Sequence, residues 1–263
     1  MTRPILADSH VHLHAYPDRA IDDMLGRAAE AGVEIVVAIS VDLSSSIRTL
    51  DIARRYPLGA DVRRPVVIPA IGFHPAQIVA TPTEADWREF EQLASTPETG
   101  LIGECGVDGI ANPSRRDIQL ETLTHQVRVA AQCDLPVNLH LRGCDFVNSA
   151  LRILSAAGLK RGRGVAHYFV GDQYLADLYL AAGLMLSVGK PVTRQENQSL
   201  RMAIREVPLN RLLLETDTYP LSGRATEPAD VRNIAESIAE LKGVSLEEVA
   251  EATTANLRQL LRK

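Results

Sequence analysis

Short apolar segments alternate with longer amphipathic segments along almost the whole chain. Eight of the short segments are continuous aliphatic or β-branched runs, which is typical of parallel strands that are covered on both faces. The expected strands span residues 5–8, 34–41, 66–71, 100–103, 136–139, 164–166, 184–188 and 211–215. Between and after them, apolar positions recur with the period of helices. The expected helices span residues 19–31, 44–56, 83–95, 115–133, 145–157, 173–182, 195–206, 228–241 and 245–261.

Start and stop signals support several of these helices. We expect N-terminal caps from Ser44-Ser45-Ser46, from Thr83 with Asp86, and from Ser245 with Glu248, where the last pair has the spacing of a capping box. Glycines mark three expected helix ends, at Gly32, Gly158 and Gly183.

The alternation predicts an α/β fold. Strands begin at intervals close to the length of one βα unit. Eight such units in 263 residues are typical of a single (β/α)8 TIM-type barrel. An open, doubly wound sheet would show the same alternation, but the first strand is not followed by the G-x-G-x-x-G turn of the common dinucleotide-binding form. No linker rich in Pro, Gly or Ser divides the chain, so we expect one domain over residues 1–263.

Composition narrows the class of protein. Apolar residues make up 46% of the chain and charged residues 23%, which excludes a disordered chain. No apolar run approaches the roughly 18 residues of a membrane span, and Arg3 and Asp8 interrupt any secretory signal. Three cysteines without a C-x-x-C spacing indicate reduced thiols and a cytoplasmic location. A net charge of −5 argues against a protein that coats nucleic acid, although a local basic pocket is allowed.

The histidines are unevenly placed. Six of the seven lie at or just after the end of an expected strand, and only His125 lies within a helical pattern. In a barrel, the carboxyl ends of all strands open on one face, which is the face that carries the chemistry. The six are His10, His12, His14, His74, His140 and His167.

Four of these histidines and two carboxylates predict a metal site. His10 and His12 are two residues apart on one strand, so their side chains point the same way. The predicted ligands are His10, His12, Glu104, His140, His167 and Asp217. Each residue alone is explained as well by a hydrogen-bonded polar group at the barrel mouth, but the set of six is not. Six ligands exceed the need of one tetrahedral ion and suit two ions with a bridging carboxylate, for which Glu104 is the candidate.

Seven ordered motifs carry a resemblance to a known family. They are D-S-H-V-H-L at residues 8–13, G-F-H-P at 72–75, I-G-E-C-G-V-D at 102–108, L-P-V-N-L-H-L-R at 135–142, H-Y-F-V-G at 167–171, L-L-E-T-D at 213–217 and R-A-T-E-P at 224–228. Together they resemble the TatD family of metal-dependent deoxyribonucleases, within the amidohydrolase-like barrels. The chain departs from the usual pattern at His14, where the family has Asp, and at Gly109, where it often has an aromatic residue. Both positions bear on substrate preference.

The resemblance implies specific roles. One ion would be held by His10, His12, Glu104 and Asp217, and a second ion by Glu104, His140 and His167. His74 would be an active-site residue that touches the scissile phosphate. The implied activity is 3′-to-5′ exonuclease hydrolysis of DNA ends by a water that two divalent ions activate. Asp217 would steer the proton of that water, and the ions would be Mg²⁺, Mn²⁺ or Zn²⁺.

A nucleic-acid substrate also requires cations near the metals. Arg142, Lys190 and Arg224 follow strands on the reactive face and are candidate phosphate ligands, although a structural salt bridge explains each of them equally well. The basic run at 160–163 precedes a strand, so we expect it on the opposite face. The aromatic residues near strand ends, Tyr168 and Tyr219 among them, are expected mostly to pack rather than to stack on bases.

Two neighbours of Glu104 have simpler interpretations. Asp108 is expected to orient a metal ligand. Cys105 is expected to pack outward against helices, because adjacent residues of a strand face opposite sides.

The sequence therefore predicts a two-metal phosphodiester hydrolase that acts on single-stranded DNA ends, with no membrane association and no obligate protein partner. A hydrolase of a small ester, amide or phosphoester could use the same site. A non-enzymatic metal-binding protein is a weaker alternative, because all six ligands are present.

Overall fold

Eight parallel strands form one sheet whose spatial order follows the sequence, in a computed structural model that describes residues 4–59, 64–220 and 226–262, with the backbone alone at 144 and 145. The strands are β1 Leu6–Val11, β2 Val33–Ile39, β3 Val66–Ile71, β4 Leu101–Asp108, β5 Val137–Arg142, β6 Gly164–Ala166, β7 Met185–Val188 and β8 Leu212–Leu214. Just beyond β8, the amides of His12 and Asp217 bond to the carbonyls of Thr218 and His10. These bonds join the last strand to the first, so the predicted (β/α)8 barrel is confirmed.

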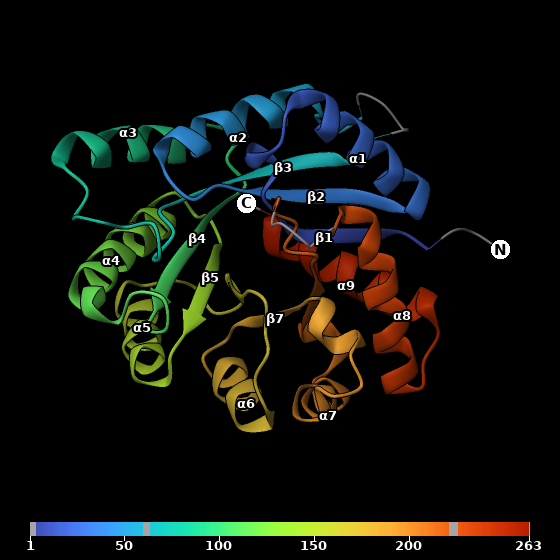
Figure 1. The fold of residues 1–263 in the computed structure, drawn as a ribbon. Coiled ribbons are helices and arrows are strands. Elements are labelled where there is room, and N and C mark those ends of the chain that lie inside the picture. Colours follow the sequence, from blue (N-terminus) through green and yellow to red (C-terminus); the bar gives the residue numbers. More distant parts are fainter. Residues whose placement is uncertain (1–3, 60–63, 221–225, 263) are drawn as a thin grey trace.

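Helices surround the strands, as Figure 1 shows. Within the described residues they are α1 Asp18–Ala31, α2 Leu43–Arg55, α3 Glu84–Ala94, α4 Arg116–Gln132, α5 Cys144–Ala156, α6 Gln173–Ala181, α7 Gln198–Glu206, α8 Val231–Lys242 and α9 Leu246–Leu261. No helix in these ranges combines the length and the apolarity that a bilayer crossing requires.

Helix α9 closes the amino-terminal end of the barrel. Its Leu257 and Leu260 pack with the barrel interior. Thr254 donates to the carbonyl of Ile5, and the amide of Asn256 donates to the carbonyls of Leu209 and Leu212. Because α9 covers the barrel interior here, the open mouth of the barrel lies at the carboxyl ends of the strands.

Two of the three predicted helix caps are confirmed. Thr83 exchanges hydrogen bonds with Asp86, and Ser245 does so with Glu248. The prediction that Ser44-Ser45-Ser46 caps α2 is wrong, because the helix begins one residue earlier and Asp42 is its N-cap. The Asp42 carboxylate accepts from the Ser45 amide at 2.7 Å, and the Ser45 hydroxyl accepts from the Asp42 amide at 2.9 Å.

Of the three predicted glycine stops, Gly32 is the C-cap of α1. Gly158 and Gly183 each lie one residue beyond the C-cap of their helix.

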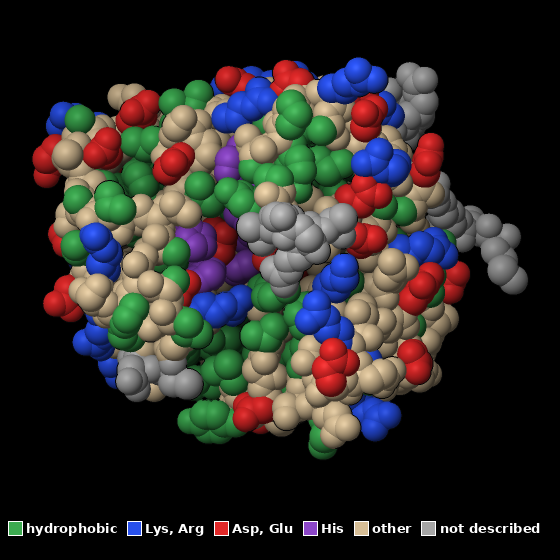
Figure 2. All heavy atoms as spheres, viewed as in Figure 1, with side chains coloured by type: hydrophobic (Ala, Val, Ile, Leu, Met, Phe, Trp, Pro, Cys, Tyr) green, Lys and Arg blue, Asp and Glu red, His purple; other side chains and the backbone are tan. Residues whose placement is uncertain are grey.

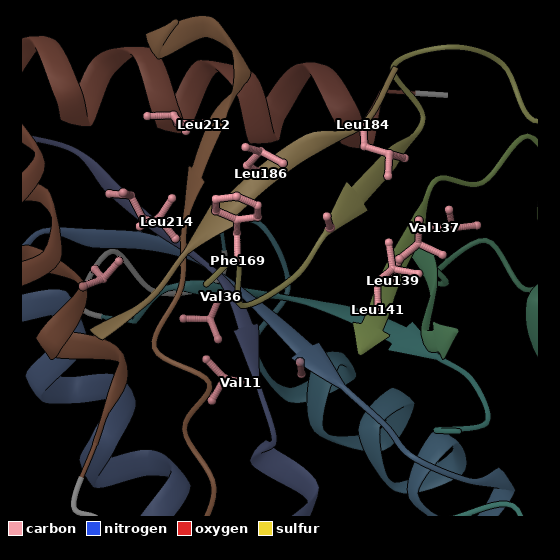
Figure 3. Packing of buried hydrophobic residues seen from close by; sticks show 14 of the residues in the cluster. Val11, Val36, Val137, Leu139, Leu141, Phe169, Leu184, Leu186, Leu212 and Leu214 are labelled. Carbon is pink, nitrogen blue, oxygen red and sulfur yellow. The ribbon is translucent and has the colours of Figure 1, made fainter. Parts of the chain in front are cut away.

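Alternate residues of the strands enter two apolar clusters. Leu213 of β8 lies in the inner cluster, inside the barrel, while Leu212 and Leu214 lie in the outer cluster beneath the helices. Figure 3 shows Leu186, Leu212, Leu214 and Phe169 in the outer cluster. The same alternation places polar residues inside the barrel near its open mouth.

Strand β4 departs from this alternation, and the departure positions Glu104. Its register against β5 shifts between Ile102 and Cys105. Leu101 belongs to the inner cluster, whereas Ile102 and Cys105, three residues apart, both belong to the outer one. Glu104 therefore points into the barrel although simple alternation from Leu101 would turn it outward. Cys105 packs outward, as predicted.

Three strands also run further than predicted. Strand β4 continues to Asp108 instead of ending at 103, so Glu104 lies within the strand rather than beyond its end. His10 and His140 likewise lie within β1 and β5. The strands were predicted to end where polar residues begin. In this barrel, however, polar side chains line the interior near the mouth while the backbones of neighbouring strands still pair.

Candidate metal centre

The six predicted ligands converge at the carboxyl ends of the strands. They come from β1, β4 and β5 and from the segments that follow β1, β6 and β8. With His74, Arg142 and Tyr168, five of them line a pocket of about 270 Å³, and His10 lies buried against that set. Figure 2 shows histidine side chains with acidic atoms between them at the bottom of a hollow in this face.

One group of donors has the dimensions of a metal site. The Nε2 atoms of His10 and His12 are 3.2 Å apart, and they lie 3.4 and 3.5 Å from Oε2 of Glu104. Oδ1 of Asp217 lies 3.8 and 3.6 Å from the same two nitrogens. Donors around a tetrahedral ion with bonds of 2.0–2.1 Å are about 3.3–3.4 Å apart. The two nitrogens and Oε2 of Glu104 therefore have the spacing of ligands of one divalent ion, and Oδ1 of Asp217 lies slightly further from the same two nitrogens.

A second group surrounds the other oxygen of Glu104. Oε1 lies 2.5 Å from Nδ1 of His140, 2.8 Å from Nε2 of His167 and 3.2 Å from Nε2 of His74. The facing nitrogens of His140 and His167 are 3.4 Å apart. His167 also lies within reach of His10 and Asp217, so it stands between the two groups. Glu104 thus presents one oxygen to each group.

The electrostatics of the site favour ionised carboxylates. Burial acts to raise the pKa of Glu104, but His74, His167, His10 and His140 outweigh it and hold that pKa well below its usual value. The pKa of Asp217 is also lowered, because His12, His10 and His167 together outweigh its burial. Burial opposes the charged form of His167, yet Glu104 and Glu215 raise its pKa to about 10. Ionised carboxylates are the form that binds cations.

Three side chains hold the far nitrogen of a histidine. Oδ1 of Asn138 lies 3.2 Å from Nδ1 of His10, and Oε1 of Glu215 lies 3.2 Å from Nδ1 of His167. Oδ2 of Asp108 lies 3.0 Å from Nε2 of His140, in the orienting position expected for it. Such partners fix the ring orientation of metal ligands. The sequence interpretation missed Asn138 and Glu215, although each lies two residues before a predicted ligand and so faces the same side.

Asp8 is a further residue that the sequence interpretation missed. Its buried carboxylate accepts from the hydroxyl of Thr216 at 2.6 Å and from the amides of Thr216 and His10. Burial raises the pKa of Asp8 to about 8. These bonds join β1 to Thr216, the residue before Asp217. The backbone φ of Asp217 is +50°. Asp8 therefore fixes the backbone from which Asp217 reaches the site.

We expect Asp108→Asn to weaken Mn²⁺ binding by about 10- to 100-fold, the usual cost of losing such an orienting partner. The Asn side chain keeps the oxygen that accepts from the amides of Ile110 and Ala111, but it presents an NH₂ group to His140. Isothermal titration with Mn²⁺ measures the change, with Asp117→Asn on α4 as the control. Equal affinities in wild type and Asp108→Asn would contradict the orienting role.

His74 lies within ligand distance of Glu104 and His140, but its hydrogen bond to the backbone favours a donor role. Its Nδ1 accepts from the amide of Ala76 at 3.0 Å. In a neutral imidazole the other nitrogen then carries the proton, so Nε2 presents an N–H to Glu104 and to the pocket. This geometry distinguishes His74 from His140 and His167.

The predicted phosphate ligands that the structure describes differ in where it places them. Arg142 lines the pocket, donates to the carbonyl of Tyr168 at 3.2 Å and lies 5.6 Å from the centre of its ring. Lys190 is exposed and lines a neighbouring cavity of about 150 Å³ with Thr193 and Asp230. Arg224 lies outside the described residues. Of the two that the structure describes, Arg142 lies in the pocket and Lys190 does not.

The remaining sequence predictions have plain structural outcomes. In the basic run, Lys160 pairs with Asp134 at 2.7 Å and Arg163 donates to the carbonyl of Leu260, at the amino-terminal end of the barrel. Nδ1 of His14 lies 2.9 Å from the carbonyl of Ile39, outside the pocket. A Cβ at Gly109 would lie 3.3 Å from the ring of Phe146. The ring of Phe146 therefore lies beside Gly109, the position at which the family often has an aromatic residue.

Comparison with known proteins agrees with this centre. The model of the family described as TatD related DNase matches residues 7–262. The uncharacterized metal-dependent hydrolase YabD of Bacillus subtilis is 31% identical over 264 residues, covering 98% of this chain and 99% of its own. The uncharacterized metal-dependent hydrolase YcfH of Escherichia coli K12 is also 31% identical, with coverage of 97% and 95%. The crystal structure of YJJV, a TatD homologue from E. coli K12, has a TM-score of 0.85 at 24% identity and covers 97% of both chains.

The barrel, the histidine and carboxylate donors and these relatives define a metal-dependent hydrolase. The chain belongs to the TatD family, as its motifs indicated.

Proposed function

We propose that this enzyme hydrolyses phosphodiester bonds at the ends of single-stranded DNA, from 3′ to 5′, with two divalent ions. The observation that carries the proposal is the placement of Glu104, whose two oxygens face two separate groups of donors. The family description as TatD related DNase supports DNA as the substrate. Free thiols at Cys105 and Cys133 support the cytoplasmic location.

In this proposal, His10, His12, Glu104 and Asp217 hold one ion, and Glu104, His140 and His167 hold the other. Mg²⁺, Mn²⁺ or Zn²⁺ bound there would lower the pKa of a water and neutralise charge on the attacking and leaving oxygens. Asp217 is the ligand best placed to accept a proton, because its side chain is 25% exposed to the pocket whereas that of Glu104 is 3% exposed.

The remaining polar groups of the pocket bind and orient the phosphate. Nε2–H of His74 points into the pocket beside Glu104 and would donate to a phosphate oxygen. The guanidinium of Arg142 would pair with a second oxygen, and its bond to the Tyr168 carbonyl holds it in place. Asp108 and Glu215 keep the rings of His140 and His167 fixed throughout.

Arg142→Ala should raise KM for single-stranded DNA by about tenfold, because it removes a charge-assisted hydrogen bond to phosphate. Binding of Mn²⁺ should change by less than about twofold, since within the described part of the chain no hydrogen bond or ion pair joins the Arg142 side chain to a predicted ligand. Steady-state kinetics and metal titration on the same preparation separate the two effects, with Arg142→Lys retaining part of the affinity for DNA. Equal losses of DNA and metal binding would refute the phosphate role.

The experiment that tests the function follows single-stranded DNA labelled at its 5′ or 3′ end, incubated with Mg²⁺, Mn²⁺ or Zn²⁺. The proposal expects release of mononucleotides from the 3′ end and a progressively shortened 5′-labelled product, with no activity in EDTA. Intact DNA alongside turnover of a small ester, amide or phosphomonoester would replace this proposal with the alternative substrate class.

A further inference from the structure

Tyr168, the residue after His167, occupies an unusual position between two cavities. It lines the metal pocket, and it also lines a larger groove of about 660 Å³. We call this second cavity the side groove; its wall includes Tyr168, Val170, Pro191, Arg194, Glu196 and Asn197. Neither the metal ligands nor their supporting residues enter the side groove. Tyr168 therefore lies between the metal pocket and the side groove and lines both of them.

The position of Tyr168 is fixed by its surroundings. Its backbone φ is +46°, which is costly for a non-glycine residue by about 1–3 kcal/mol. The amide donates to Oε1 of Glu215 at 2.6 Å, and the carbonyl accepts from Arg142 at 3.2 Å. A Cβ at Gly189 would lie only 3.1 Å from the ring, so the absence of a side chain there lets the ring lie close to β7. The site thus holds one aromatic ring rigidly at the junction of the two cavities.

The side groove contains a positively charged side chain, that of Arg194, which is not paired with a carboxylate of the described residues. Arg194 is exposed, and among the described residues no carboxylate lies within salt-bridge distance of it. Glu196 lines the same groove but forms no ion pair with it. Arg142 lies on the metal-pocket side of Tyr168, and Arg194 lies on the side-groove side. Cationic side chains along a groove, combined with an aromatic ring, are features that proteins use to bind single-stranded nucleic acid.

We propose that the side groove binds the nucleotides adjacent to the bond that is cut, with Arg194 pairing with a backbone phosphate and the ring of Tyr168 in contact with a base. This inference rests on the proposed function and assigns it a binding subsite. The metal pocket, at about 270 Å³, is small for a strand of several nucleotides, so such a strand must extend past Tyr168 or over an open rim. The side groove makes the enzyme selective for a polynucleotide over a mononucleotide ester.

The test compares two substrates in each variant: a single-stranded DNA decamer and the p-nitrophenyl ester of thymidine monophosphate, which reaches only the metal pocket. The ratio of KM for the decamer to KM for the ester should rise about tenfold in Arg194→Ala. The slope of log KM for the decamer against log salt should flatten by about 0.7, the value for one phosphate contact on a single strand. Arg161→Ala, an exposed arginine beside Gly183 at the opposite end of the barrel, is the matched control and should change neither quantity.

Two further variants examine the ring. Tyr168→Phe keeps the ring and should keep the KM ratio, whereas Tyr168→Asn should raise it about tenfold. Asn tolerates the positive φ, so the backbone of residue 168 is preserved, which thermal unfolding verifies.

An unchanged KM ratio and salt slope in Arg194→Ala, in an enzyme that degrades the decamer, would overturn the subsite alone. No degradation of the decamer by wild type, with turnover of the ester, would overturn both the subsite and the proposed DNA substrate.

Discussion

Glu104→Gln should lose at least about 1,000-fold in kcat on single-stranded DNA while the barrel remains folded. Both oxygens of Glu104 face histidine nitrogens, at 3.4 Å for His10 and 2.5 Å for His140. The amide keeps the shape of the side chain but removes its charge and presents an NH₂ group to one set of donors. Both ions would lose their common anionic ligand, and several kcal/mol of transition-state stabilisation would be lost with them.

The measurement is kcat at saturating Mn²⁺, together with metal content and far-UV circular dichroism. Glu98→Gln, an exposed carboxylate on the loop before β4, is the matched control and should retain full activity. Wild-type turnover by a folded Glu104→Gln enzyme would contradict the assignment of Glu104 as the bridge.

Gly106→Ala should destabilise the protein by at least about 3 kcal/mol, which lowers the melting temperature by about 10 °C in a chain of this size. A Cβ at Gly106 would lie 2.0 Å from the carbonyl oxygen of His140, and the backbone φ is +144°. Strands β4 and β5 would have to separate at the level of the metal ligands. We therefore expect loss of Mn²⁺ binding as well as of stability.

Gly158→Ala distinguishes the effect of this steric clash from the cost of placing Ala in a backbone with positive φ. Gly158 also has a positive φ, of +78°, but no atom lies within 4 Å of the position of its Cβ. Its substitution should cost only about 1–2 kcal/mol and leave metal binding intact. Differential scanning calorimetry in EDTA compares the two variants, and equal melting temperatures would show that the close approach of β4 to β5 is unimportant.

The fold could be predicted from sequence because its signals are local. Apolar runs and helical periodicity gave eight strands and nine helices that agree with the structure to within a few residues over most of their length. The ends of β4 and β5 could not be predicted, since Glu104 and His140 are polar and yet buried within paired strands. The inward and outward side chains of β4 change places at Gly103, where the backbone lies close to Asn138 of the neighbouring strand. A Cβ at Gly103 would lie 2.6 Å from the carbonyl oxygen of Asn138, and this proximity cannot be read from the sequence.

The ligand set could also be predicted, because histidines and carboxylates at strand ends must meet at the mouth of a barrel. Of the supporting residues, Asp108 was predicted, but Asn138 and Glu215 were not, since they resemble ordinary strand positions until their partners are known. The donor state of His74 depends on the Ala76 amide, which only the turn after β3 reveals. Lys190 was expected near the substrate because it follows β7, but its 3₁₀ turn, Lys190–Thr193, directs it to a separate cavity.

The central claim is that Glu104 lies between two ions, and anomalous diffraction from crystals grown with Mn²⁺ tests it most directly. The account predicts two Mn²⁺ peaks about 3.5–4 Å apart. One peak should lie among His10, His12 and Asp217, and the other beside His140 and His167. A single peak at full occupancy, or two peaks of which neither contacts Glu104, would contradict the account.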